Sequence, residues 1–521
     1  MIKTIYKSCL LAIMAIGASC KINAQKAIDT KGMNIIFIMA DDLGWSDTEL
    51  YGTTNLYKTE NIKRLAARGL TFTNAYAASP LCSPTRATVL TGQTSARNGI
   101  VSAVGHARKV ELKPSLRPRG KAEYKAIEVN SATRLNNELP TLAKQLKASG
   151  YATAHFGKWH LGHTPFTPLE HGFDLDLPHA NTPGPAGGYL APWKYTDFKP
   201  NYPEEHIEDR MSEEAISWMK SLDKEQPFFM NYWMFSVHGP WGGKKDLIEK
   251  YRQEIDTTQR QRSPAYAAMV HSLDDAVGAL LDEVDRLGIA DRTAIVFFSD
   301  NGGNMYTKLK EHTVDGTEYK AVVTNNFPLK GGKATMYEGG IRVPCVIVWP
   351  GLTKPGTQTD ARIQSTDFYP TLLKLVNASK PKDYPVDGID FSPALKNPKW
   401  ERKAPMFTYF PAPPHVGNWL PPALTVHQGK WKLFRLFHQG ENQKHDYLLY
   451  NLEKDIGETK NLAAKYPKIV KKLDALIEEH IKETGAVVPV ANPKFDPTKY
   501  RPELVGVQNN PNRFAEVNAG K

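Results

Sequence analysis

The chain has 521 residues, of which 41% are hydrophobic and 23% carry a charge. This composition is typical of a globular protein and excludes both a disordered chain and a membrane-embedded one. The formal net charge of +11 favours an anionic partner. Nucleic acid, an acidic surface and an acidic polysaccharide remain candidates, beside an ordinary solvated basic surface.

The first 24 residues are predicted to be a signal peptide. Lys3 and Lys7 precede the apolar run CLLAIMAIGAS, which is too short to span a bilayer. We expect cleavage after Ala24 and a periplasmic or secreted protein. Lipidation at Cys20 is the alternative, although Gly17 is a poor residue three positions before it. No later stretch is long enough for a membrane span.

Five short apolar runs alternate with amphipathic stretches, as in a mostly parallel sheet sandwiched by helices. The runs lie at residues 34–40, 151–156, 227–237, 293–298 and 343–349. Between the third and fourth runs, apolar residues from Met269 to Leu287 cover one face of a helix that Gly288 is placed to end. The pattern predicts a large α/β domain in residues 25–404.

A smaller unit is expected in residues 405–521. The runs ALTVHQGKWKLFRLF and YLLYNLEKDIGETKNLA indicate strands and turns, and KYPKIVKKLDALIEEHIKETG indicates a helix. We predict a small C-terminal antiparallel sheet with a helix against it, followed by a tail from Ala486 that wraps the surface.

Polar side chains follow four of the apolar runs, at the strand ends where an open parallel sheet binds its ligands. These residues are Asp41, Asp42, Lys158, His160, His238, Asp300 and Asn301. The carboxylate and amide oxygens suit a hard cation such as calcium or magnesium and not zinc. The alternative is that the adjacent aspartates are ordinary caps.

The cationic strand-end residues predict a pocket for a compact oxyanion. Lys158 and His160, two apart in a segment expected to be extended, should point the same way. With His238, Arg86 and Lys333 they would line a positively charged pocket that fits sulfate or phosphate bridged to the metal. The alternative is a set of separate surface and core residues.

Cys82, in SPLCSPTRATVLTG, is the other candidate for chemistry. Arg86 is only four positions later, whereas a thiol phosphatase loop needs six, and no second cysteine nearby supports a zinc site. What remains is a residue at the first turn of a helix, where the dipole favours an anionic ligand. A disulfide between Cys82 and Cys345 also remains open.

Six further segments join CSPTRATVLTG in a resemblance to one family over nearly the whole chain. They are NIIFIMADDLGWSD, GYATAHFGKWHLG, FFSDNGG, GGKATMYEGGIRVP, STDFYPTLL and LYNLEKDIGETKNLA. In this order they resemble the type I sulfatases of the alkaline phosphatase superfamily. The resemblance implies the alkaline phosphatase fold and an enzyme that hydrolyses sulfate esters. It also implies that nucleic acid is not a partner.

The resemblance also implies a modified residue and a metal. Cys82 would be oxidised to formylglycine (3-oxoalanine) by a formylglycine-generating maturation enzyme, and its hydrated aldehyde would attack sulfur. A geminal diol has one oxygen for the attack and a second whose deprotonation breaks the intermediate, which neither a thiol nor a serine offers. One calcium ion would be held by Asp41, Asp42, the modified residue 82, Asp300 and Asn301.

The remaining site residues receive roles by the same resemblance. Arg86 would orient residue 82, while Lys158 and Lys333 would bind sulfate. His238 would protonate the departing alcohol, helped by Lys333. His160 would take a proton from the covalent sulfo-intermediate, which expels sulfate and restores the aldehyde.

The substrate side is indicated by loops rich in cationic and aromatic residues. They are the basic insertion HARKVELKPSLRPRGKAEYK, the loop with His179, Trp193, Lys194 and Tyr195, and PAPPHVGNW with His415 and Trp419. His179, Trp193 and His415 are the predicted substrate contacts, and the substrate is predicted to be a sulfated mono-, oligo- or polysaccharide. The alternatives are a phosphoester or phosphonate hydrolase of the same fold and, if Cys82 stays unmodified, a non-catalytic protein that binds sulfated glycans.

Overall fold

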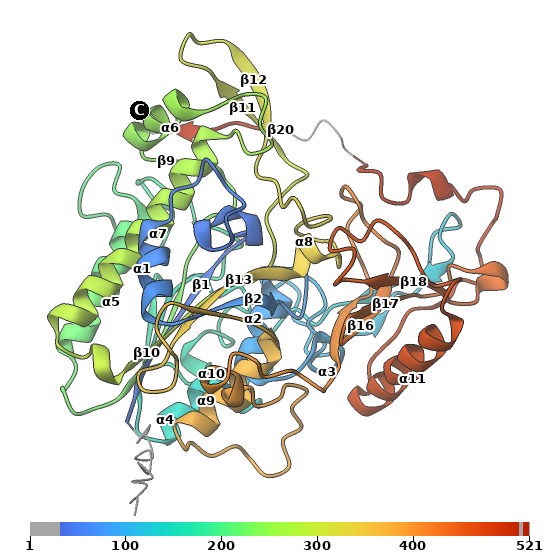
Figure 1. The fold of residues 1–521 in the computed structure, drawn as a ribbon, viewed down its shortest axis with the longest axis horizontal. Helices are drawn as coiled ribbons and strands as arrows, with labels where there is room; N and C mark the ends of the chain where they lie inside the picture. Colours follow the sequence, from blue (N-terminus) through green and yellow to red (C-terminus); the bar gives the residue numbers. More distant parts are fainter. Residues whose placement is uncertain (1–31, 510–513, 520–521) are drawn as a thin grey trace, which may run out of the picture.

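The computed structural model describes residues 32–509 and 514–519, and an eight-stranded sheet lies at its centre (Figure 1). The strand order is β14-β2-β13-β10-β1-β8-β6-β7. Their bounds are β1 (Asn34–Ala40), β2 (Leu70–Tyr76), β6 (Ala152–Gly157), β7 (Leu175–Leu177), β8 (Phe228–Trp233), β10 (Thr293–Ser299), β13 (Arg342–Val348) and β14 (Thr357–Gln364).

The sheet is mixed but mostly parallel, which confirms the predicted class. Strand β1 pairs in parallel with β8 and β10, and β6 pairs in parallel with β7 and β8. The run at 343–349 also forms a strand, β13, but it lies antiparallel to both β10 and β2. Strands β2 and β14 were not predicted, because their sequences LTFTNAY and TQTDARIQ contain polar residues instead of an apolar run.

Helices cover both faces of this sheet, and each face has its own apolar core. One face carries α1 (Glu60–Arg68), α5 (Ile207–Ser221), α6 (Lys245–Glu254) and α7 (Pro264–Arg286). The other carries α2 (Cys82–Thr91), α4 (Leu142–Ala148), α9 (Phe368–Leu375) and α10 (Ser392–Lys396). Helix α7 is the one predicted from the spacing between Met269 and Leu287, and Arg286 is its last residue.

A smaller antiparallel sheet with one long helix forms the C-terminal part, as predicted. Its strands are β15 (Met406–Phe410), β16 (Ala423–Gln428), β17 (Trp431–Leu436) and β18 (Asp446–Asn451), in that spatial order. Helix α11 (Pro467–Thr484) packs on this sheet through Leu473 and Ile477. The predicted division at residue 404 falls just before β15.

The tail runs back over the main body of the protein. Strand β19 (Val490–Ala491) pairs with β4 (Ala126–Ile127), immediately after the basic insertion. Strands β20 (Phe514–Ala515) and β21 (Asn518–Ala519) pair with β11 (Lys308–His312) and β9 (Gly242–Gly243). These pairings agree with the predicted wrapping of the tail around the surface.

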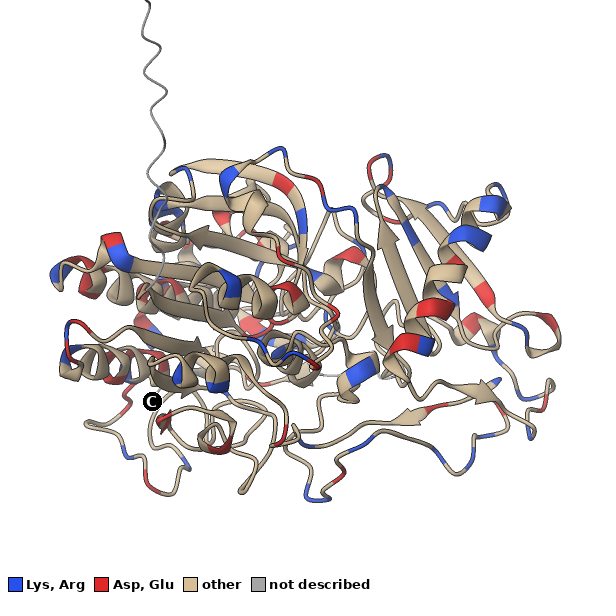
Figure 2. Ribbon diagram, turned by 90° about the horizontal axis from the view of Figure 1, so that it is seen from below, with Lys and Arg blue, Asp and Glu red and all other residues tan. Residues whose placement is uncertain are grey.

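Charges of both signs are interspersed over the molecule (Figure 2). Within the described residues, none of the helices has the length and apolar character needed to cross a bilayer. The predicted signal peptide at residues 1–24 lies outside the described residues.

Candidate active site

The ends of β1 and β10 bring four oxygen-bearing side chains together. The two strands pair in parallel with Ala40 opposite Ser299, so the residues that follow them are neighbours. The backbone N–H of Asp42 donates to Oδ1 of Asp300 at 3.2 Å, and Nδ2 of Asn301 donates to Oδ1 of Asp42 at 2.8 Å. Asp41 directly follows β1 and is also buried.

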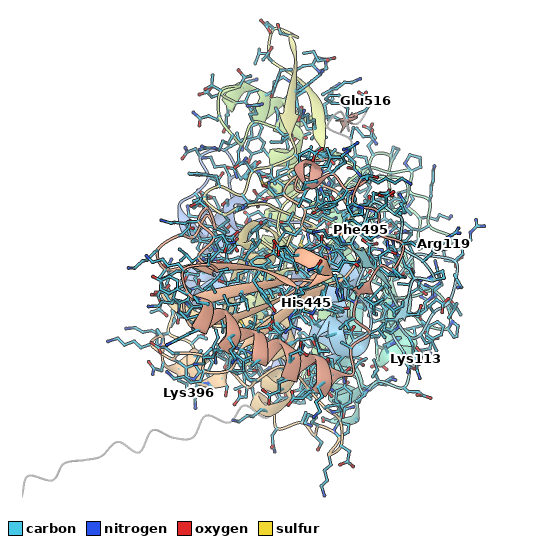
Figure 3. All side chains as sticks on the ribbon, turned by 90° about the vertical axis from the view of Figure 1, so that its right-hand side faces the viewer. Lys113, Arg119, Lys396, His445, Phe495 and Glu516 are labelled. Carbon is cyan, nitrogen blue, oxygen red and sulfur yellow. The ribbon has the colours of Figure 1, made fainter. Side chains whose placement is uncertain are left out.

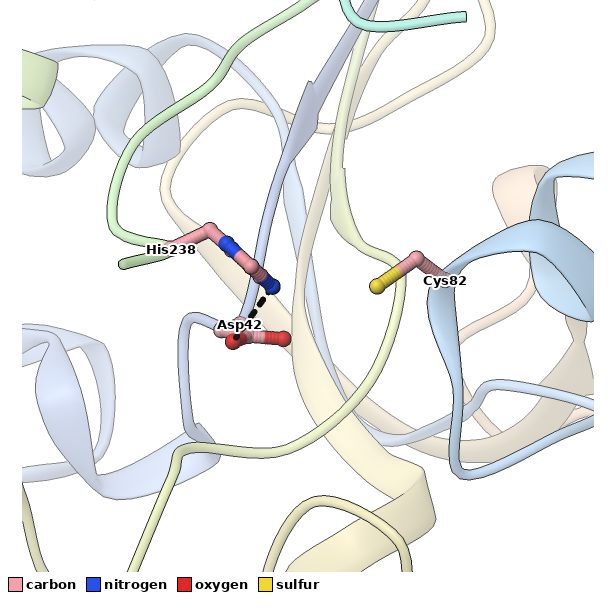
Figure 4. Close-up of side chains that lie close together, drawn as sticks. All are labelled: Asp42, Cys82 and His238. Carbon is pink, nitrogen blue, oxygen red and sulfur yellow. Dashed lines mark ion pairs between the residues drawn. The ribbon is translucent and has the colours of Figure 1, made fainter. Parts of the chain in front are cut away.

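Cys82 completes this cluster as the first residue of α2. A carboxylate oxygen from each of Asp41, Asp42 and Asp300 and the sulfur of Cys82 all lie within 4.8 Å of one another. In Figure 4 the Cys82 sulfur points across a gap toward Asp42 and His238. The position has the helix N-terminus and the nearby oxygens that the sequence predicted.

Three buried cations hold the carboxylates in place. Arg86 donates from Nε and Nη2 to Oδ2 of Asp300, at 3.0 and 2.8 Å. Lys158 Nζ lies 2.5 Å from Oδ2 of Asp41, and Lys333 Nζ lies 2.7 Å from Oδ2 of Asp42. Three carboxylates and three cations leave the cluster close to electrically neutral.

The donor set fits a hard cation. Oδ1 of Asp41 and Oδ1 of Asn301 are buried and have no hydrogen-bond partner among the described residues. Because a buried oxygen without a partner costs free energy, this pair is suited to binding an ion. Burial and the Asp41 carboxylate raise the pKa of Asp300 to about 6, despite its contact with Arg86. A divalent cation would relieve this repulsion, and oxygen donors of this kind match calcium or magnesium.

The acidity of the remaining groups limits what each can do. Burial raises the pKa of the Cys82 thiol to about 12, so an unmodified cysteine here remains a thiol at neutral pH. Burial lowers the pKa of His238 to about 3, with help from Lys333 and Lys158. Burial opposes the charge on Lys333, but Asp42 outweighs it and holds the pKa well above its ordinary value.

The segment from Lys158 to His160 departs from the predicted geometry. Strand β6 ends at Gly157, and His160 has a φ of 58°, so the alternation of an extended strand does not apply. Lys158 contacts Asp41, whereas Nε2 of His160 lies 2.8 Å from Nδ1 of His106. Burial, followed by Lys158, lowers the pKa of His160 well below its ordinary value, so its ring is neutral.

Three residues that the sequence did not single out support this site. The first is the exposed His106, the partner of His160. The second is Glu208 on α5, which accepts from the backbone N–H groups of residues 235 and 236, at 2.9 and 2.8 Å. The hydroxyl of Tyr189 donates to the carbonyls of residues 235 and 238, at 2.6 and 2.8 Å. Glu208 and Tyr189 thus fix the loop that carries His238. No sequence motif marks either residue.

The three predicted substrate contacts lie in different surroundings. His179 is about half exposed and pairs with Asp176 at 2.7 Å. Trp193 is only 6% exposed and stacks on Phe198 in the core, so its placement does not support a sugar contact. His415 stacks on Trp419 with ring centres 3.8 Å apart and lines a surface groove.

The two cysteines among residues 32–509 are not joined. Cys82 and Cys345 are both buried free thiols, so the disulfide considered from the sequence is absent. Cys345 lies within β13 and is fully buried among apolar residues. It is therefore a packing residue, separate from the site.

Most of the chain is similar to known sulfatases. The sulfatase family model matches residues 33–378, and a model described as N-sulphoglucosamine sulphohydrolase, C-terminal, matches residues 332–483. Human N-acetylgalactosamine-6-sulfatase is 30% identical over 505 residues, covering 89% of this chain and 87% of the relative.

Solved structures show the same architecture. The crystal structure of Ps i-CgsB in complex with k-i-k-neocarrahexaose has a TM-score of 0.67 and 25% identity, covering 87% of this chain and 93% of the other. A phosphonate monoester hydrolase of Agrobacterium radiobacter has a TM-score of 0.57 at 18% identity, covering 88% and 99%, and shows the fold alone.

Proposed function

Because the chain belongs to the type I sulfatases of the alkaline phosphatase superfamily and is a sulfuric ester hydrolase, we propose that it removes sulfate from a sulfated carbohydrate. We further propose that it does so with formylglycine derived from Cys82 and one calcium ion. The observation that carries this proposal is the buried cluster in which Asp41, Asp42, Asp300 and Cys82 face one another within 4.8 Å.

We propose that calcium is held by Asp41, Asp42, Asp300, Asn301 and the modified residue 82. The two unpartnered oxygens, Oδ1 of Asp41 and Oδ1 of Asn301, support this assignment. When bound, the ion supplies positive charge that lowers the pKa of an adjacent hydroxyl and offsets the charge of the sulfate. The chain's own part is to hold the donors in place, which Arg86 does for Asp300 through two hydrogen bonds.

The proposed modification fits the surroundings of position 82. As its hydrate, formylglycine supplies two hydroxyl groups on one carbon at neutral pH, whereas burial keeps the unmodified thiol protonated. The first turn of α2 also directs backbone N–H groups toward an anion at this position.

The lysine and histidine side chains have separate roles in binding sulfate and transferring protons. Lys158 and Lys333 bind the sulfate oxygens and stabilise the negative charge that develops there. His238 holds a proton at Nε2 for the departing alcohol oxygen, and the negative charge of bound sulfate raises its pKa toward the range needed for that role. His160 accepts a proton at Nδ1, the ring nitrogen that has no partner among the described residues.

We propose a carbohydrate substrate because the names of similar proteins refer to a sulfated sugar or to a bound glycan. The human relative is named for an N-acetylgalactosamine 6-sulfate, and the neighbouring crystal structure holds a neocarrahexaose. We propose that His179 and His415 contribute to the substrate side. We also propose export by the signal peptide at residues 1–24, a main domain at 25–404, a C-terminal unit at 405–521, and a maturation enzyme that oxidises Cys82.

The reaction is tested by assaying the sulfate and phosphate monoesters of one phenol. We expect sulfate release to dominate and to disappear in Cys82→Ala, while the melting temperature stays near that of the wild type. Turnover of the phosphate ester alone would overturn the assignment to sulfate.

The modification is tested separately, by mass spectrometry of the peptide that contains position 82. Conversion of the thiol to an aldehyde is expected in active material. If only cysteine is found and no ester is hydrolysed, the chain is a glycan-binding protein instead.

A further inference from the structure

Two adjoining hollows form one groove beside the site. Their volumes are about 570 and 210 Å³. They share five lining residues, which are Tyr124, Ala126, Glu128, His415 and Asn509. We call the pair the tail groove, because its walls are the basic insertion, the loop around His415 and tail residues 499–509.

The tail groove begins next to the site. Leu81 lines its inner hollow and is the residue immediately before Cys82, at the N-terminal cap of α2. Ala103, three residues before His106, lines the same hollow. Tyr500 and Arg501, in the tail, line the outer hollow. The tail groove therefore extends from the neighbour of Cys82 in the sequence to the C-terminal tail.

The walls of the groove are held by defined contacts. The indole N–H of Trp419 donates to the carbonyl of Val507 at 2.9 Å, and the backbone N–H of Asn418 donates to the carbonyl of Gly506 at 2.7 Å. Asn509 lies 2.9 Å from the His415 ring through its side-chain amide. The pairing of β19 with β4 fastens the tail to the two residues that directly follow the insertion. The groove is thus formed in advance of any ligand, which lowers the entropy cost of binding.

The lining combines aromatic rings with an excess of positive charge. His415 stacks on Trp419, and the Tyr124 ring meets His415 edge-on at 5.6 Å. Six cationic side chains line the two hollows, against two acidic ones. The cations are Arg117, Arg119, Lys121, Lys125, Lys499 and Arg501, and the acids are Glu123 and Glu128.

Arg119 and Arg501 are exposed, and they are the two groove cations whose side chains have no ion pair or hydrogen bond among the described residues. Arg117 pairs with Glu128 at 2.5 Å, and Lys121 lies 3.9 Å from Glu123. Of the two exposed cations, Arg119 lies in the basic insertion, next to the inner hollow. Figure 3 shows Arg119 projecting from the same side of the molecule as Lys113.

We propose that the tail groove binds the sugars that continue from the sulfated residue, in an oligosaccharide that carries at least one further acidic group. Arg119 pairs with that group, a sulfate or a carboxylate, and the ring of Tyr124 or His415 packs on a sugar face. This inference rests on the proposed function and narrows its substrate class from any sulfated sugar to an anionic oligosaccharide.

The test measures binding to Cys82→Ala enzyme by titration calorimetry, so that turnover plays no part. The probes are two ladders of sulfated oligosaccharides, from di- to hexasaccharide, one from chondroitin sulfate with carboxylates and one from a sulfated galactan without them. We expect affinity to rise at least about tenfold with length in one ladder. Adding Arg119→Glu should remove most of this gain, whereas Lys113→Glu, a charge reversal in the same insertion outside the groove, should not.

The outcomes test binding in the groove separately from the release of sulfate. Affinity that does not depend on length in either ladder would overturn the proposal that the groove binds the oligosaccharide. Equal losses of affinity in the two charge-reversal variants would overturn it as well. Sulfate release from a monosaccharide sulfate by the wild type, measured in parallel, tests the proposed function alone. A groove that binds long oligosaccharides in an enzyme that releases no sulfate would support the inference about binding and overturn the reaction.

Discussion

Replacing Glu208 by Gln is expected to change how stability depends on pH. Glu208 is fully buried on α5, and Oε1 accepts from the backbone N–H groups of Phe235 and Ser236. The amide of Gln keeps an oxygen acceptor in the same place but cannot ionise. The substitution therefore isolates the ionisation of this carboxyl group from its hydrogen bonds.

The magnitude follows from the acidity of the group. Burial raises the pKa of Glu208 from 4.5 to about 7, although hydrogen bonds from Ser236 and Phe235 oppose the rise. Between these values the folded protein keeps the proton and the unfolded chain loses it, so wild-type stability falls as the pH rises. The loss totals about 3 kcal/mol between pH 4.5 and 7 and stays constant above that range.

The assay is urea unfolding of wild type and Glu208→Gln at several values between pH 4 and 8. Other groups titrate equally in both proteins, so their contributions cancel in the difference. We expect the Gln variant to gain about 3 kcal/mol relative to the wild type across this range. A difference that stays flat with pH would refute a raised pKa for this carboxyl group.

Three further results are expected from the site. His238→Ala should lower kcat/KM for sugar sulfates by a factor of about 10² to 10⁴, and much less for aryl sulfates with good leaving groups. Equal losses on both substrates would contradict an acid role. Chelation should lower the melting temperature, and added calcium should restore it. At a calcium concentration a hundred times the Kd, the free energy of unfolding should rise by about 3 kcal/mol. An unchanged melting temperature would argue against the ion. His106→Ala should lower kcat about tenfold with little change in KM, since it removes the 2.8 Å partner of His160, and His106→Asn should recover part of the loss.

The sequence predicted the groups at the strand ends because their placement depends on local order. Asp41 directly follows one apolar run, Asp300 comes two residues after another, and two such runs paired in parallel must bring their ends together. Strand β13 is different, because an apolar run carries no information about its direction in the sheet. The turn at His160 likewise overrides the alternation expected of a strand, since a φ of 58° redirects the side chain.

The supporting residues depend on contacts between distant segments and could not be read from a pattern. Glu208 lies 27 and 28 positions before the amides it binds, and His106 lies 54 before His160. In each case a single polar residue in an ordinary helix or loop becomes important only through its partner. Trp193 shows the converse, because an aromatic residue in a loop predicted to contact the substrate is packed into the core.

Neither the spacing nor the acidity at position 82 suits a thiol nucleophile. Arg86 lies four positions after Cys82, which does not match a thiol phosphatase loop. Because burial raises the pKa of the thiol to about 12, only about one molecule in 10⁵ is ionised at neutral pH. The cations Lys158 and Lys333 act on Cys82 to lower that pKa but do not overcome burial. A thiol nucleophile is therefore disfavoured here, which is compatible with the proposed conversion of Cys82 to formylglycine.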